Sequence, residues 1–89
     1  MLVKIDKSFQ KDVRRIKEKN ILKRIAATIR HIQKAENISD IRNLKKLAGS
    51  NNDFRIRIGN YRIGLIISKD SVEFVRFLHR KDIFKYFPK

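Results

Sequence analysis

Two arginines, two residues apart, lie in the part of the chain best suited to chemistry on phosphate. Arg55 and Arg57 alternate with apolar residues in the segment Phe54-Arg55-Ile56-Arg57-Ile58. If this segment is a strand, successive side chains point to opposite faces, so both guanidinium groups share one face. Guanidinium groups bind phosphate through paired, charge-assisted hydrogen bonds. The spacing therefore predicts an anion site on one face of a sheet.

A turn is expected to bring further cations to this pair. Gly59-Asn60 has the glycine-first composition of a two-residue hairpin, which folds Arg62 back beside the pair on the next strand. Arg80 adds a fourth cation at the end of the last expected strand, next to His79. Like charges this close repel one another, so the arrangement favours an anion between them. The alternative is the solvated polar face of an ordinary sheet.

These residue types suit cleavage of RNA by attack of its own 2′-hydroxyl on the adjacent phosphate. The reaction needs a base, an acid and stabilisation of transition-state charge. Arginine stabilises charge, but its pKa above about 12 prevents it from acting as an effective general base at neutral pH. Proton transfer then falls to His79, to Tyr86, or to the RNA and water. Tyr86 has two other interpretations, namely stacking on an RNA base or packing with its aromatic neighbours.

The composition describes a small and strongly basic chain. It has 89 residues, with 23 Lys and Arg against 9 Asp and Glu, and a formal net charge of +14. This length suits one core, so residues 1–89 are predicted to form a single domain. Such a field attracts polyanions, which makes nucleic acid, the ribosome or an acidic protein the expected partners. The alternative is that the charge serves solubility alone.

Several classes of site are excluded or disfavoured. The chain has no cysteine and two histidines, so we expect no disulfide, no metal and no other cofactor. The longest apolar run is Leu65-Ile66-Ile67, which is too short to cross a membrane, and the first residues lack a signal-peptide core. We therefore expect a cytoplasmic protein with no membrane contact.

The elements that must position these residues form an α+β fold, with an N-terminal strand and a helical hairpin packed on a small antiparallel β-sheet. The helices are expected to cover one sheet face and leave the other free to bind. In chain order we expect a strand over 2–5, a helix from 6 or 8 to about 19, a break at Asn20, a helix over about 21–36, a segment 37–48 with room for a helical turn, a loop over 49–53, strands over 54–58, 61–67 and 72–78, and a last segment 79–89 that is a helical turn or an extended tail.

The polar residues of the two helices are expected to have no specific role in the predicted site. The lysines and arginines between Lys11 and Arg24 are interpreted as the solvated face of the hairpin, with a secondary role in gripping a phosphate backbone. His31 lies on the second helix without a partner motif, so we expect it at the surface.

The segment from Phe54 to Gly64, followed by Leu78-His79-Arg80-Lys81-Asp82 and Tyr86, resembles the RelE-type toxins of the RelE/ParE superfamily. These are the toxic halves of prokaryotic toxin–antitoxin pairs. The resemblance covers nearly the whole chain, including the helical hairpin and Leu47-Ala48-Gly49. It implies a RelE-like microbial ribonuclease-type fold. It also implies a ribosome-dependent endoribonuclease, an mRNA interferase, that cuts mRNA in the ribosomal A site and inhibits translation.

The resemblance also implies roles for individual residues. Arg55 and Arg57 match basic residues that orient or activate the 2′-hydroxyl and hold the RNA backbone. Arg62 matches the arginine that stabilises the phosphate transition state. Arg80 matches the basic residue near the leaving 5′-oxygen, and Tyr86 matches the tyrosine that stacks on or orients the substrate base.

Three further residues complete the predicted site. Lys81 and Lys85 are assigned to RNA binding, and His79 resembles a histidine of some relatives, so we hypothesise that it takes part in proton transfer. In the best-known type, one of the first two basic positions is often lysine, which loses its proton more readily than arginine. The identity of the general base therefore stays open.

The resemblance implies several partners and leaves two alternatives. The partners are a RelB-like antitoxin, expected to be acidic and partly disordered before it wraps the toxin, the ribosome with its mRNA, and operator DNA for the antitoxin complex. One alternative is a ParE-like inhibitor of DNA gyrase, although such chains generally lack the full set of arginines and the tyrosine. The other is a non-enzymatic nucleic-acid-binding module of the same fold.

Overall fold

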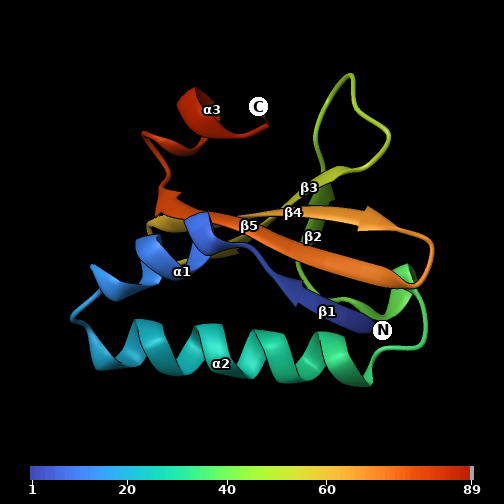
Figure 1. The fold of residues 1–89 in the computed structure, drawn as a ribbon, viewed down its shortest axis with the longest axis horizontal. Helices are drawn as coiled ribbons and strands as arrows, with labels where there is room; N and C mark the ends of the chain where they lie inside the picture. Colours follow the sequence, from blue (N-terminus) through green and yellow to red (C-terminus); the bar gives the residue numbers. More distant parts are fainter. Residues whose placement is uncertain (89) are drawn as a thin grey trace.

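The computed structural model describes residues 1–88 and confirms the expected α+β class. One five-stranded sheet carries two helices on one face and a short helix on the other (Figure 1). The elements in chain order are β1 (Leu2–Ile5), α1 (Lys7–Arg14), α2 (Lys19–Lys34), a 3-10 turn η1 (Ile38–Asp40), β2 (Leu44–Lys46), β3 (Asp53–Ile58), β4 (Tyr61–Ser68), β5 (Ser71–His79) and α3 (Ile83–Tyr86). No helix within this described part of the chain is long and apolar enough to cross a membrane.

The sheet has the strand order β1-β5-β4-β3-β2. Strands β3, β4 and β5 form the expected antiparallel meander, while β1 pairs in parallel with β5 at one edge. The other edge is β2, a three-residue strand antiparallel to β3 that lies in the segment left unassigned in the sequence. Three residues are too few to show an alternating pattern, so β2 exists through its pairing with β3 and not through a local signal.

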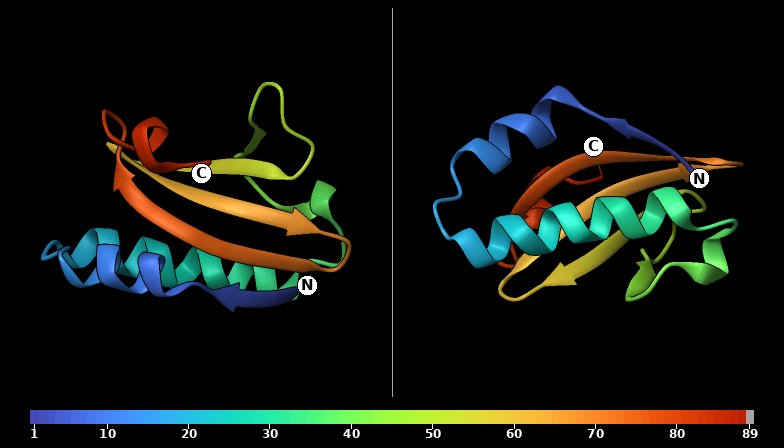
Figure 2. Two further views of the ribbon diagram at one scale, coloured as in Figure 1. Left: turned by 45° about the horizontal axis from the view of Figure 1, so that its top comes forward. Right: turned by 90° about the horizontal axis from the view of Figure 1, so that it is seen from below.

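The helical hairpin lies across the face of the sheet seen from below in Figure 2. The carboxylate of Asp6 begins α1 by accepting a hydrogen bond from the backbone N of Ser8 at 3.0 Å. The end of α1 was predicted wrongly, because the helix stops at Arg14 and not near residue 19. The expected break at Asn20 is also wrong, since α2 already begins at Lys19.

Tertiary packing explains these two differences. After Asp12 the backbone hydrogen bonds span three residues, as in a 3-10 helix, and no longer four. They run from Arg15 N to Asp12 O at 3.2 Å and from Ile16 N to Val13 O at 3.0 Å. This change carries Ile16 onto the core beside Val13, after which the chain turns back into α2. The charged run that follows Ile16 has no periodicity that marks this turn.

The main core lies between the hairpin and the sheet. Every second residue of β3 and β4 enters it, as do the inward residues of both helices. Its fully buried members include Ile32 of α2, Ile63 and Leu65 of β4, and Phe74 of β5. The core therefore fixes which residues of each strand face the helices and which face away.

The opposite face is not as open as the sequence suggested. Phe87 and Ile83 pack on Val75 of β5 and form a second small core. Gly64 makes this possible, because a Cβ at that position would lie 2.6 Å from the Phe87 ring. The last segment therefore includes a helical turn, α3, that folds back over the sheet, and only Lys89 of that segment lies outside the described residues.

Candidate active site

Strands β3 and β4 place three arginines on the face opposite the helical hairpin. Phe54, Ile56 and Ile58 are buried in the main core, so the alternating arginines of β3 point away from it. Arg62 is directly opposite Arg57 in the β3–β4 ladder, and directly opposite residues share a face. The structure thus brings together the three arginines that the sequence placed in one patch.

Arg62 is held in place by the turn that precedes it. Its Nη1 donates to the carbonyl oxygens of Gly59 at 3.1 Å and Tyr61 at 2.9 Å. Burial lowers the pKa of Arg62, and three neighbouring cations lower it further: Arg55, Arg57 and Arg80. The four positive charges therefore act on one another, and an anion placed among them would relieve the repulsion.

Arg80 joins this field from the end of β5. Its backbone N donates to the carbonyl oxygen of Asn60 at 2.7 Å, which ties the residue to the β3–β4 turn. Its side chain is exposed, and its charge helps to lower the pKa of Arg62. The positive charge of Arg80 thus lies close enough to Arg62 to interact with it.

An open hollow of about 540 Å³ lies beside these arginines. We call it the arginine hollow, and it is lined by Arg24, Asn43, Lys45, Arg55, Arg57, Gly59 and Arg62. Arg24 from α2 and Lys45 from β2 were not among the predicted site residues. The first was counted with the solvated face of the helix, and the second lies on a strand that the sequence does not reveal. No sequence signal could have linked either residue to the hollow, because both enter it through tertiary packing.

His79 is not brought to the arginine hollow. It pairs directly with Tyr61, and Tyr61 stacks on Phe77 at a ring distance of 5.0 Å within the main core. Arg62 pairs with Leu78, so it lies on the other side of the sheet. The His79 Nδ1 accepts a hydrogen bond from Lys81 N at 3.2 Å. Alternation along β5 already places His79 on the face of Phe77, a signal that sequence reasoning missed.

Tyr86 lies against a residue that the sequence did not single out. The guanidinium of Arg76 sits 5.2 Å from the centre of the Tyr86 ring. Arg76 is itself fixed by the buried carboxylate of Asp12, with Nε 2.8 Å from Oδ2 and Nη2 3.1 Å from Oδ1. This hydrogen bond raises the pKa of Arg76, against an opposing effect of burial. A chain of contacts thus runs from α1 through β5 to α3.

The two predicted RNA-binding lysines are exposed near α3. Lys85 forms an ion pair with Asp82 over 3.6 Å, and both side chains are largely solvated. Lys81 is exposed in the turn between β5 and α3. Their positions leave them free to contact a bound polyanion, but neither lines the arginine hollow.

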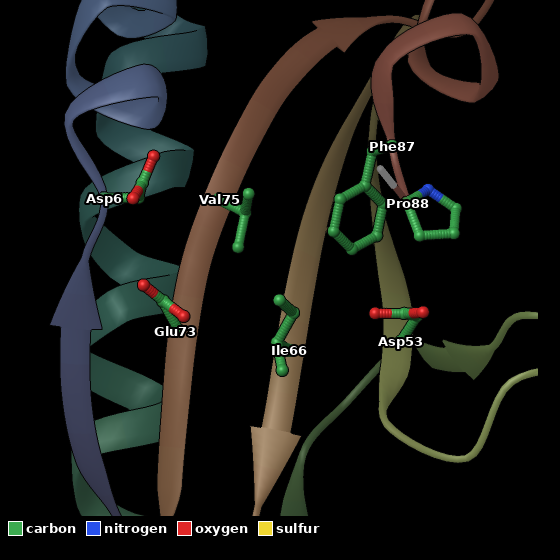
Figure 3. Close-up of a pocket in the computed structure, with 7 residues that line it drawn as sticks. All are labelled: Asp6, Asp53, Ile66, Glu73, Val75, Phe87 and Pro88. Carbon is green, nitrogen blue, oxygen red and sulfur yellow. The ribbon is translucent and has the colours of Figure 1, made fainter.

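A second pocket on the same face has the opposite charge. It has a volume of about 260 Å³ and is lined by Asp6, Asp53, Ile66, Glu73, Val75, Phe87 and Pro88. Figure 3 shows Asp6 and Glu73 on one side of an apolar floor and Asp53 on the other. Carboxylates repel phosphate, so of these two sites only the arginine hollow has a lining that suits a phosphate group. Within residues 1–88, no group of His, Cys, Asp or Glu is arranged to hold a metal ion.

Comparison with known proteins identifies the family of proteins to which this chain belongs. Residues 3–84 match the family described as "ParE toxin of type II toxin-antitoxin system, parDE". The chain is 42% identical over 89 residues to Toxin RelE3 of Methanocaldococcus jannaschii, covering 99% of this chain and 100% of that protein. The chain therefore belongs to the RelE/ParE toxin superfamily, as a RelE-type toxin.

Solved structures are similar over nearly the same length. A chain in the crystal structure of the RelB-RelE antitoxin-toxin complex from Methanococcus jannaschii is 39% identical, with a TM-score of 0.81, and the match covers 96% of this chain and 99% of that one. YafQ from Escherichia coli strain BL21(DE3) is 17% identical, with a TM-score of 0.64 and coverage of 92% and 96%. The second likeness shows the shared fold alone.

Proposed function

We propose that this toxin is a ribosome-dependent endoribonuclease that cleaves mRNA in the ribosomal A site and so inhibits translation. The observation that carries the proposal is the convergence of Arg55, Arg57 and Arg62 on one hollow, with Arg80 close enough to share their field. Such a site stabilises a phosphorane-like transition state, in which negative charge builds up on the phosphate oxygens. Residues 1–89 act as a single toxin domain in this proposal.

The proposed reaction begins with attack of a 2′-hydroxyl oxygen on the adjacent phosphorus. The new O–P bond forms a 2′,3′-cyclic phosphate while the bond to the 5′-oxygen of the next nucleotide breaks. Arg62 binds the non-bridging oxygens, since the turn carbonyls hold its guanidinium in place. Arg55 and Arg57 hold the backbone and orient the 2′-hydroxyl, while Arg80 stabilises the leaving 5′-oxygen.

Proton transfer in this proposal goes to water and the RNA. The 2′-hydroxyl proton leaves to solvent, and the 5′-oxygen gains a proton from solvent. His79 receives no direct part because it lies on the other face of the sheet from Arg62. Tyr86 orients the substrate base, and the exposed Lys81 and Lys85 contact RNA beyond the hollow.

The proposed partners follow from the family and the charge. The RelB-RelE complex supports a RelB-like antitoxin for this chain, and a +14 toxin favours an acidic binding segment. The ribosome, its message and, for the antitoxin complex, operator DNA are the further partners that we propose. A ribosomal target places the activity in the cytoplasm.

The first test is an in vitro translation reaction with the purified protein. Message 5′ ends are mapped by primer extension for wild type, Arg62→Ala and Lys4→Ala, a control on the far edge strand β1. We expect cuts within codons that require ribosomes, persist in Lys4→Ala and disappear in Arg62→Ala. Equal cutting by wild type and Arg62→Ala would contradict the proposal.

A second candidate function is inhibition of DNA gyrase. The matching family description names ParE toxins, which supports testing it. The test is a supercoiling assay with purified gyrase. Loss of supercoiling at toxin concentrations that leave messages uncut would favour this second function.

A further inference from the structure

We propose that the cationic hollow continues around the open edge of β3 and binds the phosphate backbone of RNA beside the scissile phosphate. The inference rests on the proposed nuclease function and extends its site. Its first support is the shortness of β2, whose last partner along β3 is Ile56. Asn43 then turns the chain away with φ of 61°, so β2 leaves Arg57 and Ile58 unpaired on that side.

A second hollow lies at this open edge, between β3 and α2. It has a volume of about 410 Å³, and its lining includes Arg24, Thr28, His31, Arg42, Asn43 and Arg57. Three of these residues, Arg24, Asn43 and Arg57, also line the arginine hollow. The two hollows therefore share a wall, and we call the two together the edge groove.

The edge groove carries one sign of charge. Its ionisable lining consists of five arginines, one lysine and one histidine, and no Asp or Glu of residues 1–88 lines either hollow. His31 Nε2 accepts a hydrogen bond from Arg42 N at 3.2 Å, which leaves Nδ1 as a hydrogen-bond donor. A groove of cations and donors around an exposed strand edge suits a chain of phosphates.

The structure favours RNA over an acidic protein segment in this groove. A protein segment gains most from apolar anchors, and an apolar groove lies elsewhere, between α1 and α2, lined by Phe9, Val13, Leu22 and Ile25 among others. The edge groove instead begins at Arg62, where the scissile phosphate is held in the proposed reaction. A strand of RNA that reaches Arg62 can continue along the edge groove without leaving positive charge.

The test compares two variants that remove the same charge from opposite edges of the sheet. Arg42→Gln/Lys45→Gln changes the edge groove, and Lys4→Gln/Lys7→Gln changes the β1 edge as a control. The probe is a short fluorescein-labelled single-stranded RNA with methylated 2′-hydroxyls, which prevents cleavage, and binding is followed by anisotropy at several salt concentrations. We expect affinity about tenfold weaker in the groove variant than in the control. The slope of log affinity against log salt should fall by about 1.4 in magnitude, since each lost phosphate contact removes about 0.7.

Two further probes, small ribosomal subunits without message and polyglutamate, distinguish the message from ribosomal RNA and from an acidic protein. Small ribosomal subunits without message report contacts to ribosomal RNA, and the labelled RNA reports contacts to the message. A groove-specific loss of affinity for the labelled RNA supports the proposal. A loss confined to the small ribosomal subunits would assign the groove to ribosomal RNA and would overturn the claim that it binds the message beside the scissile phosphate. Equal affinities of the two variants for the labelled RNA and for the subunits would overturn the proposal, and so would a groove-specific loss confined to polyglutamate, which would assign the groove to an acidic protein.

Two controls keep the result interpretable. Arg24→Gln on α2 repeats the test without changing β2, so a loss of folding at the short edge strand cannot mimic a loss of binding. Message cleavage on the ribosome is measured in parallel with wild type. If wild type cleaves the message but the groove variants bind RNA as tightly as the control, the proposed groove is rejected and the nuclease function stands. If wild type does not cleave the message, the nuclease function is rejected, and the RNA-binding measurement still tests the groove.

Discussion

Asp12 and Arg76 are 64 residues apart in the chain and form a two-point ion pair between α1 and β5. The same carboxylate accepts the backbone N–H of Phe77 at 2.9 Å. β1 pairs with β5 only as far as Phe74, so no β1 residue lies beside Phe77 to accept its backbone N–H. The Asp12 carboxylate accepts that hydrogen bond instead. One buried side chain therefore joins the hairpin to the sheet and holds the guanidinium on which Tyr86 rests.

Replacement of Asp12 by alanine is expected to destabilise the fold by about 2–4 kcal/mol. The change leaves the Phe77 N–H and the partly buried Arg76 without their acceptor. Urea unfolding followed by circular dichroism measures the effect, and Glu36→Ala, at an exposed acid, is the control. A loss below about 1 kcal/mol would mean that water replaces the carboxylate at this edge.

Replacement of Arg76 is expected to act on cleavage through Tyr86. Arg76→Lys keeps a charge but loses the two-point geometry and the flat contact with the ring, so we expect about a tenfold lower kcat with KM changed less. The same change in a Tyr86→Ala background should cost no further activity, although it should still cost stability. Additive losses of activity would assign Arg76 a role independent of Tyr86.

Removal of one arginine from the pair Arg57 and Arg62 should stabilise the free protein while weakening its function. Directly opposite like charges are destabilising, so Arg57→Gln is expected to raise the free energy of unfolding by about 0.5 kcal/mol. Pyrophosphate should raise the melting temperature of wild type through binding to the folded state, and raise that of the variant less. Equal shifts in both proteins would show that the anion binds outside the hollow.

The pH profile tests the absence of a histidine from the proton transfer. A cation with a lowered pKa stays charged below that pKa, so Arg62 supports the reaction through the neutral range and fails only in strong alkali. With water as the proton acceptor, single-turnover cleavage should rise steadily from about pH 6 to 9. His79→Gln should leave this profile unchanged. A profile that levels off in wild type but keeps rising in the variant would restore His79 as a base.

The close contact between Gly64 and Phe87 predicts a strong effect of one methyl group. Gly64→Ala places a Cβ against the aromatic ring, so either the ring or the C-terminal segment must move, at a cost of about 1–3 kcal/mol. Thermal unfolding measures the loss. Phe87→Leu should reduce the clash, so the double variant is expected to lose less than the sum of the single variants.

The meander could be predicted because its alternation is local. Phe54-Arg55-Ile56-Arg57-Ile58 and the Gly59-Asn60 turn together determine which side chains share a face. Three features could not be predicted, because each depends on contacts with residues far along the chain: the end of α1, the strand β2 and the Asp12–Arg76 pair. The position of His79 was accessible in principle through alternation along β5, whereas the entry of Arg24 into the hollow depends on how α2 crosses the sheet.

Phe87 lies on Gly64 between two regions of unlike charge on one sheet face. Beyond it in one direction are the arginines of the hollow, and in the other the carboxylates of the pocket in Figure 3. This separation makes the charge of that sheet face uneven, with cations at one end and carboxylates at the other. A large polyanion attracts the arginine end of this face and repels the carboxylate end before contact. Collisions with such a target would therefore begin already oriented, which raises the fraction of encounters that are productive.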